Sequence, residues 1–164
     1  MNRPLFALAV GACLTAPLAA KDSLGIYSSW GAFRDDGPVH CYAIAKPERE
    51  RDSDPFASIA TYPARGVERQ VHLRLSRSVS ASARVRLTVG SRQFDLAANG
   101  RNAWGRDGRM DAAIVAAMRS ASTMRVAARD VGGVRFVDRY DLAGAATAID
   151  AATVGCANRE TATR

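Results

Sequence analysis

The sequence predicts a mainly β protein: a β-sandwich or partly open barrel of about eight strands with one or two short helices. Apolar and polar residues alternate with a period of two over most of the chain, which is typical of strands that have one buried face. Glycine, proline, asparagine and aspartate gather between these runs, as they do in turns. Many short strands with few helices favour a sandwich or a barrel.

The first twenty residues predict a secretory signal peptide. They hold a positive charge at Arg3, an apolar run over residues 5–14 and a small-residue end at Ala20. We therefore expect cleavage near Ala20, a single β-rich domain over residues 21–164 and a periplasmic or secreted location. A Val-Gly-Ala-Cys segment ending at Cys13 resembles a lipobox, so a lipoprotein anchored there is the alternative. No later apolar stretch approaches the ~18–20 residues that span a bilayer, and we expect no transmembrane segment.

Removal of this segment leaves two cysteines, Cys41 and Cys156, near opposite ends of the domain. An exported protein with an even number of cysteines is expected to pair them. Closing so long a loop restricts the unfolded chain by roughly 4–5 kcal/mol in the chain-entropy model. The chain has no Cys-x-x-Cys motif, which favours a structural disulfide over a redox-active one.

The strands of the first half are separated by clear turn signals. Residues 23–33 alternate and predict one strand, and residues 38–45 form a mostly apolar strand after an Arg-Asp-Asp-Gly-Pro turn. The charged segment 46–55, bounded by prolines, predicts a solvated loop. Residues 56–62 predict a third strand, which ends at a Pro-Ala-Arg-Gly turn.

The second half continues the alternation, and a Gly-Gly turn between its last two strands is a strong hairpin signal. A loop rich in glycine and asparagine over residues 98–108 carries Trp104. The strands of this half are predicted over residues 69–76, 83–90, 91–96, 123–130 and 134–142.

One segment departs from the strand pattern. Residues 110–121 place large apolar side chains at helical spacing, and Asp107 or Asp111 is suited to cap the start of this helix. The alanine-rich tail, residues 143–156, predicts a short second helix that brings Cys156 to the core.

The chain is strongly basic, with a formal net charge of +7, and nearly all of its cations are arginine. A basic exported protein is suited to anionic lipid, lipopolysaccharide or acidic polymer. The arginines are scattered along the sequence, and no basic run is interleaved with aromatic residues. We therefore expect no nucleic-acid partner.

The sequence shows no catalytic or cofactor motif. Two histidines, His40 and His72, are too few for a zinc site beside a disulfide, so we expect no metal. No serine lies in a Gly-x-Ser-x-Gly elbow, and no glycine-rich segment forms a phosphate loop, so we expect no cofactor and no enzyme. Two alternatives stay open: a periplasmic enzyme with a site built from Asp and Arg residues, and a structural or stress-related periplasmic protein.

Trp104 is the aromatic residue that points most directly to a binding role. A large ring in a polar, glycine-flanked loop is either tucked under the loop or exposed for a partner. Arginines lie close to it in the sequence. The candidate binding surface is therefore Trp104 with Arg101, Arg106 and Arg109.

Several segments in a fixed order resemble one family. They are Trp-Gly-Ala at 30–32 before a cysteine-bearing strand, the hairpin at 85–96, the helix Ala-Ala-Ile-Val-Ala-Ala-Met-Arg at 112–119, and Tyr-x-Leu-x-Gly at 140–144 before Cys156. This series is similar to the invasion-associated locus B proteins, which are exported by alphaproteobacteria. The resemblance implies a small periplasmic or surface protein with a β-sandwich-like fold and no enzymatic activity. It agrees with a non-catalytic interaction module whose partner is an envelope or host-surface protein, or anionic lipid or lipopolysaccharide.

Overall fold

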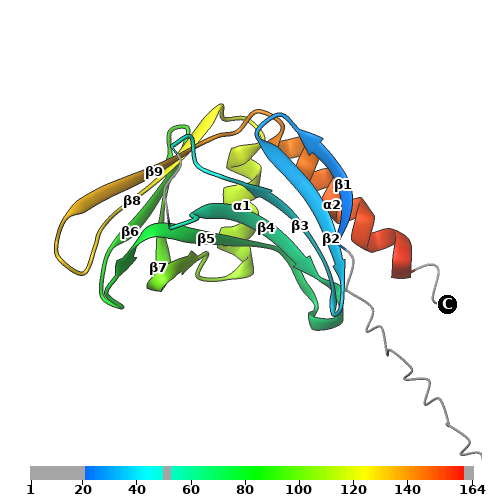
Figure 1. Cartoon of the computed structure of the whole chain (residues 1–164), viewed down its shortest axis with the longest axis horizontal. Coiled ribbons are helices and arrows are strands. Elements are labelled where there is room, and N and C mark those ends of the chain that lie inside the picture. The colour runs from blue at the N-terminus through cyan, green and yellow to red at the C-terminus, as the bar shows by residue number, and fades with distance from the viewer. Residues whose placement is uncertain (1–20, 50–52, 161–164) are drawn as a thin grey trace, which may run out of the picture.

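The computed structural model describes residues 21–49 and 53–160, without the side chains of residues 158–160. Within these residues the chain forms a nine-stranded antiparallel sheet that does not close, together with the helices α1 (Gly108–Met118) and α2 (Ala145–Glu160). The sheet curves into an arch (Figure 1). The mainly β prediction is thus confirmed. The predicted signal peptide lies outside the described residues.

The strands pair in the order β1-β2-β3-β4-β5-β7-β6-β8-β9. A short 3-10 turn, Pro63–Arg65, joins β4 to β5. The long strand β7 pairs with β6 through its first half and with β5 through its second half, so it links the two arms of the arch. The strands are β1 (Lys21–Tyr27), β2 (Trp30–Asp36), β3 (Val39–Ala45), β4 (Phe56–Tyr62), β5 (Val67–Val79), β6 (Val85–Val89), β7 (Arg92–Trp104), β8 (Thr123–Arg129) and β9 (Arg135–Asp141).

The prediction of one strand over residues 23–33 is wrong, because the chain reverses at Ser28 and forms the hairpin β1–β2. Ser28 lies at φ 51°, in the left-handed region. The next residue, Ser29, donates its backbone N–H to the carbonyl of Ala143 at 3.4 Å. The alternation of apolar residues runs through this reversal without a break, which is why the sequence pattern did not reveal the turn.

The predicted loop over residues 98–108 is wrong for most of its length, because β7 continues to Trp104. Gly100, the glycine within this part of β7, lies at φ 58° and stands opposite Val79 of β5. Further along, Ala103 stands opposite Leu73. Pairing with β5 thus outweighs the local preference of glycine and asparagine for turns.

The hydrophobic core lies on the face of the sheet that the helices cover. α2 packs on β1 to β4, and α1 packs on β5. The side chains of Leu73, Ile114 and Ile149 are fully buried between these layers. Of the two predicted caps, Asp107 is the one that caps α1, since its carboxylate accepts the backbone N–H of Met110 at 2.8 Å, whereas Asp111 lies in the first turn of the helix.

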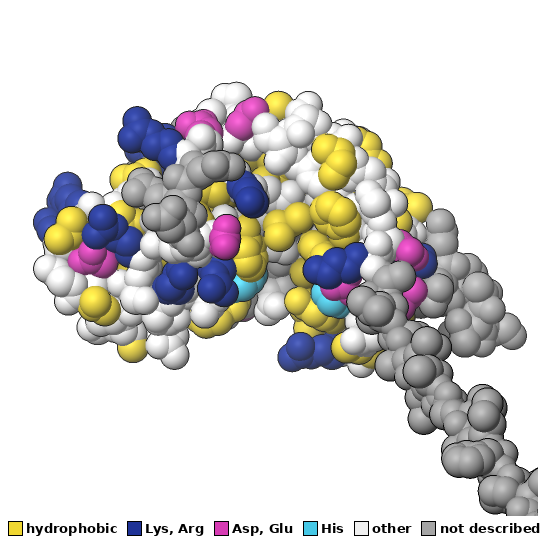
Figure 2. All heavy atoms as spheres, in the orientation of Figure 1, with side chains coloured by type: hydrophobic (Ala, Val, Ile, Leu, Met, Phe, Trp, Pro, Cys, Tyr) yellow, Lys and Arg dark blue, Asp and Glu magenta, His cyan; other side chains and the backbone are white. Residues whose placement is uncertain are grey.

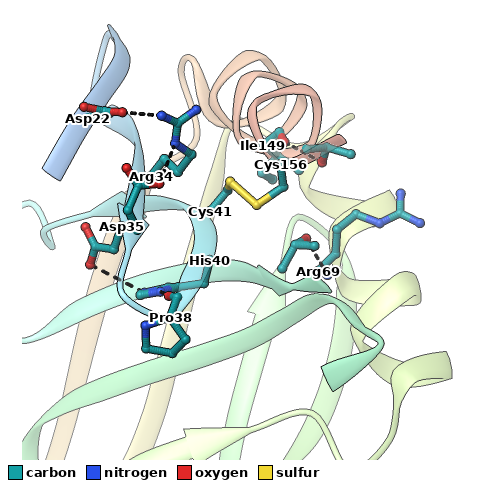
Figure 3. Close-up of a disulfide and its surroundings, with 12 residues drawn as sticks. Asp22, Arg34, Asp35, Pro38, His40, Cys41, Arg69, Ile149 and Cys156 are labelled. Carbon is teal, nitrogen blue, oxygen red and sulfur yellow. Dashed lines mark hydrogen bonds and ion pairs between the residues drawn. A yellow bond between two sulfur atoms is a disulfide. The ribbon is translucent and has the colours of Figure 1, made fainter. Parts of the chain in front are cut away.

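The disulfide predicted from the cysteine count joins β3 to α2. Cys41 and Cys156 are both buried, and their Cα atoms lie 5.8 Å apart (Figure 3). The bridge fixes α2 to an interior strand of the sheet. No helix among residues 21–49 and 53–160 has the length and the apolar composition needed to cross a membrane.

Candidate functional site

The face of the sheet opposite the helices carries a row of aromatic side chains. Alternation along the strands causes this, because the residues on either side of each core residue point away from the helices. Strand register then places four of these outward residues next to one another across β3, β4, β5 and β7. They are Ile44, Ser58, His72 and Trp104.

One cluster of rings lies on β2, β3 and β4. The His40 ring stacks between Tyr42 and Tyr62, with centroids 5.3 and 5.1 Å apart and interplanar angles of 21° and 12°. Phe33 extends the cluster, with its ring centroid 5.8 Å from that of Tyr42. All of these side chains are partly buried, so each ring keeps an edge or a face toward solvent.

A second cluster lies on β4, β5 and β7. The ring of His72 stacks on Trp104, with centroids 6.1 Å apart, and forms a T-shaped contact with Phe56, with centroids 5.4 Å apart. Its Nε2 lies 3.0 Å from the side-chain oxygen of Asn102. Between the two clusters, β4 carries the small outward side chains of Ser58 and Ala60, which stand opposite Ile44 of β3 and Gln70 of β5. The aromatic face is defined here as Phe33, His40, Tyr42, Phe56, Tyr62, His72 and Trp104.

Polar contacts hold the first cluster in place. His40 Nδ1 lies 3.1 Å from the carbonyl of Pro38, and its Nε2 lies 3.6 Å from a carboxylate oxygen of Asp35 (Figure 3). Burial raises the pKa of Tyr42, and the nearby Asp35 carboxylate raises it further. Tyr42 is therefore a neutral hydrogen-bonding group at ordinary pH. Figure 2 shows hydrophobic, histidine and basic side chains on both sides of a hollow at the lower edge of the molecule.

The structure separates the residues of the sequence-predicted surface. Trp104 is partly buried at the end of β7, within the aromatic face. Arg101 donates to the backbone carbonyls of Leu75 and Ser53, so its side chain braces β5. Arg106 and Arg109 are exposed, at the turn before α1 and in its first turn.

The sequence analysis singled out only Trp104 among the rings of the aromatic face as a candidate for binding. The signal was present in the alternation. His40 and Tyr42 flank the buried Cys41, and His72 lies between the buried Val71 and Leu73. Rings at such positions point away from the core, so they can be exposed.

The buried acids that an Asp/Arg enzyme site would use have structural roles. The carboxylate of Asp111 accepts the backbone N–H of Val71. This residue of β5 lies beyond the end of β7, so β7 provides no partner for its N–H. Asp138 accepts the N–H of Ser76, where the register of β5 shifts. Five residues of strand separate these two bonds, roughly 17 Å. Burial raises the pKa of Asp111 despite its hydrogen bond.

A metal centre would need several ligating side chains close together. Nowhere in the described part of the chain do three or more His, Cys, Asp or Glu side chains gather to hold an ion.

The comparisons with protein-family models, with curated proteins and with solved structures found no match for this chain. The aromatic face offers flat rings that already contact one another, with a small number of hydrogen-bonding groups between them. Such a surface suits contact with another macromolecule.

Proposed function

We propose that this chain is an exported, non-catalytic binding module that contacts a protein of the cell envelope or host surface through its aromatic face. The observation that carries this proposal is a broad set of aromatic rings on the sheet face that the helices leave uncovered. The predicted signal peptide supports export. The resemblance to the invasion-associated locus B proteins supports a periplasmic or surface role without catalysis.

The composition of the aromatic face matches that of protein interfaces. Tyrosine, tryptophan, phenylalanine and arginine are enriched where proteins bind one another, and a few central aromatic residues supply most of the binding energy. Trp104 and its stacking partner His72 lie on neighbouring strands of this face. Because the rings already restrain each other, binding a partner orders few further side chains.

The test is crosslinking in the native host, followed by pull-down from the envelope fraction and mass spectrometry. The wild type is compared with the double variant Trp104→Ala/His72→Ala. The matched control is Val154→Ala, which removes an exposed apolar side chain from α2, on the other side of the sheet.

We expect one dominant protein partner, captured by the wild type and by the control and lost at least about tenfold in the double variant, as for a hot-spot residue. Equal capture by all three proteins would overturn the assignment of the aromatic face. Recovery of lipid without any protein partner would overturn the proposal of a protein-binding module.

A further inference from the structure

The hairpin formed by β8 and β9 ends in an exposed apolar tip. Val131 and Val134, in the turn, are 75% and 54% exposed, and Val137 of β9 is 37% exposed. In Figure 1 this hairpin forms the end of one arm of the arch. Valines that are exposed together on one projecting turn form a local apolar patch. Such a patch indicates an interaction site, whereas single exposed apolar residues are normal on a protein surface.

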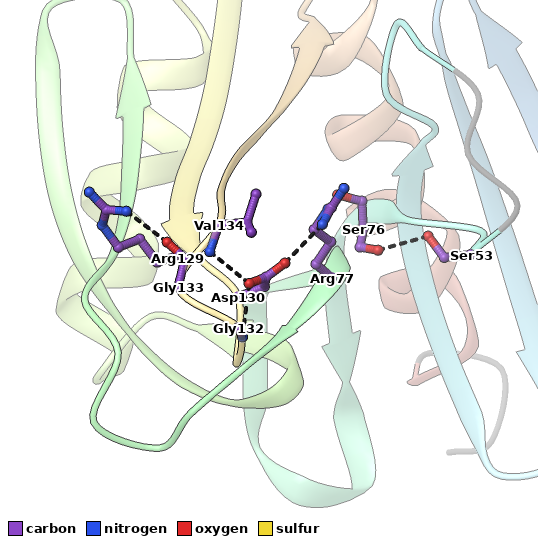
Figure 4. Close-up of polar contacts among 8 residues, drawn as sticks. All are labelled: Ser53, Ser76, Arg77, Arg129, Asp130, Gly132, Gly133 and Val134. Carbon is purple, nitrogen blue, oxygen red and sulfur yellow. Dashed lines mark hydrogen bonds and ion pairs between the residues drawn. The ribbon is translucent and has the colours of Figure 1, made fainter.

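The tip is an ordered turn. The Asp130 carboxylate accepts the backbone N–H groups of Gly132 and Val134 at 3.0 and 2.9 Å, and it pairs with Arg77 of β5 at 2.8 Å (Figure 4). The backbone N–H of Val131 donates to the carbonyl of Ser78, which also belongs to β5. These bonds fix the turn to the body of the protein and hold the valines outward.

Arginines lie behind this tip on the outward face of β8 and β9, and on β6 and just before it. The sequence scatters these residues, but strand register gathers them on one face. Arg125 stands directly opposite Arg139, and Arg129 stands directly opposite Arg135. Like charges in directly opposed positions destabilise a sheet, so the stability of the fold does not explain why arginines occupy these positions. The arginine collar is defined here as Arg84, Arg86, Arg125, Arg129, Arg135 and Arg139.

Among the residues that the structure describes, few acidic ones lie near this charge, and although Glu48 lines a hollow with Arg125 and Arg139, it forms no ion pair with either. Asp95 pairs with Arg86 at 3.2 Å, and Asp130 is engaged by Arg77. No ion pair in the described part of the chain involves the other members of the collar. A hollow of about 530 Å³ lies between these strands, and its lining includes Arg84 and Arg135. In Figure 2, basic side chains gather over this arm and hydrophobic ones reach its end.

We propose that the β8–β9 hairpin docks on an anionic lipid surface. Val131 and Val134 enter the boundary between headgroups and acyl chains, and the arginine collar pairs with the lipid phosphates. This surface lies apart from the aromatic face, and the inference goes beyond the proposed function.

The combination of an apolar tip and a cationic collar selects lipid over other anions. A soluble acidic polymer would pair with the arginines but would gain nothing from exposed valines. At a lipid surface, apolar side chains gain by entering the interface, and phosphates lie at the depth of the cations behind them. An interfacial anchor of this kind needs both parts, since either alone binds weakly.

The test is cosedimentation of the purified protein with vesicles of phosphatidylcholine, with and without phosphatidylglycerol. The first variant, Val131→Ser/Val134→Ser, removes the apolar tip. The second, Arg84→Gln/Arg135→Gln, removes two charges from the collar. The matched control, Arg106→Gln/Arg109→Gln, removes the same charge from the region of α1.

We expect binding to the anionic vesicles that weakens as salt is added, and little binding to the neutral ones. Because each arginine near an anionic surface contributes about fivefold in affinity, the collar variant should lose about 25-fold. The affinity of the tip variant for anionic vesicles should fall about tenfold, and its binding should still weaken as salt is added. The control should bind like the wild type. Thermal unfolding provides a second readout. The collar variant should be no less stable than the wild type, because Arg135 no longer repels Arg129 across the hairpin.

Three results would overturn the inference. The first is equal binding to neutral and anionic vesicles. The second is a control variant that loses as much as the collar variant, since net charge alone would then explain binding. The third is full binding by the tip variant together with competition by soluble polyphosphate, which would identify an acidic polymer as the ligand. None of these outcomes bears on capture of a protein through Trp104, so the two proposals fail separately.

Discussion

Removing the disulfide should lower the stability of the folded protein by several kcal/mol. The perturbation is the double variant Cys41→Ala/Cys156→Ala. Both cysteines are buried, and they lie 115 residues apart in the sequence. The bridge thus closes nearly the whole described domain into one loop, and the unfolded chain loses much of its freedom as long as the bridge is intact.

The magnitude follows from the loop length. In the chain-entropy model, a loop of this size restricts the unfolded state by about 4.8 kcal/mol at 25 °C, and measured effects are usually smaller. We therefore expect the free energy of unfolding to fall by about 3–5 kcal/mol. With an unfolding entropy of about 2.1 cal/mol/K per residue, this corresponds to a decrease in Tm of roughly 10–16 °C.

Urea unfolding at 25 °C, followed by tryptophan fluorescence, measures this change. Trp30 is fully buried and donates its Nε1–H to the carbonyl of Asp141 at 2.9 Å, so its emission reports loss of the core. Wild-type protein treated with a reductant should match the double variant, and the reductant should leave the variant unchanged. The m value should rise without the bridge, because the unfolded chain expands further. A loss below about 1 kcal/mol would refute the view that the bridge acts on the unfolded state.

Three further predictions concern single residues. Gly144 lies at φ +82°, and a Cβ there would stand 1.8 Å from the backbone oxygen of Tyr27. The free energy of unfolding of Gly144→Ala, measured in urea, should therefore be lower by at least about 2 kcal/mol. An unchanged urea midpoint would contradict the close approach of Gly144 to the backbone of Tyr27. Asp107→Ala should lose about 1 kcal/mol, because the N–H of Met110 loses its cap, whereas Asp107→Ser should keep most of the stability. The Arg77 hydrogen bond lowers the pKa of Asp130, so its ionised form stabilises the folded state above pH 4, and that stability is lost as pH falls further. Between pH 4 and pH 2 the Tm of the wild type should thus fall more than that of Asp130→Asn, and parallel curves would count against the pairing.

Local patterns were sufficient to predict much of the fold. The mostly apolar composition around Cys41 marked β3 as a strand, and helical spacing marked the helix that begins after Asp107. Once Cys13 was set aside with the predicted signal peptide, the cysteine count was enough to pair Cys41 with Cys156. These features depend on residues that lie close together in the chain, or on a pairing that has only one solution.

The features that the sequence did not predict depend on tertiary partners. Nothing near Gly100 indicates a strand, since β7 continues there because β5 lies beside it. The reversal at Ser28 contains no glycine or proline. It is stabilised by a tertiary contact, because the backbone N–H of Ser29 donates to the carbonyl of Ala143, just before α2. The aromatic face was missed for a related reason. Alternation assigns residues to two faces but does not tell which of them the helices will cover.

The arginine collar shows where sequence reasoning could have gone further. The Gly132–Gly133 turn was a strong hairpin signal, and a hairpin centred there fixes which residues face each other. Arg129 must then stand opposite Arg135, and Arg125 opposite Arg139, as they do in the folded chain. Cations that are scattered along the chain thus become opposed pairs as soon as the register is written out. Such pairs oppose sheet formation, so their presence beside an apolar hairpin turn is by itself a reason to look for an anionic partner.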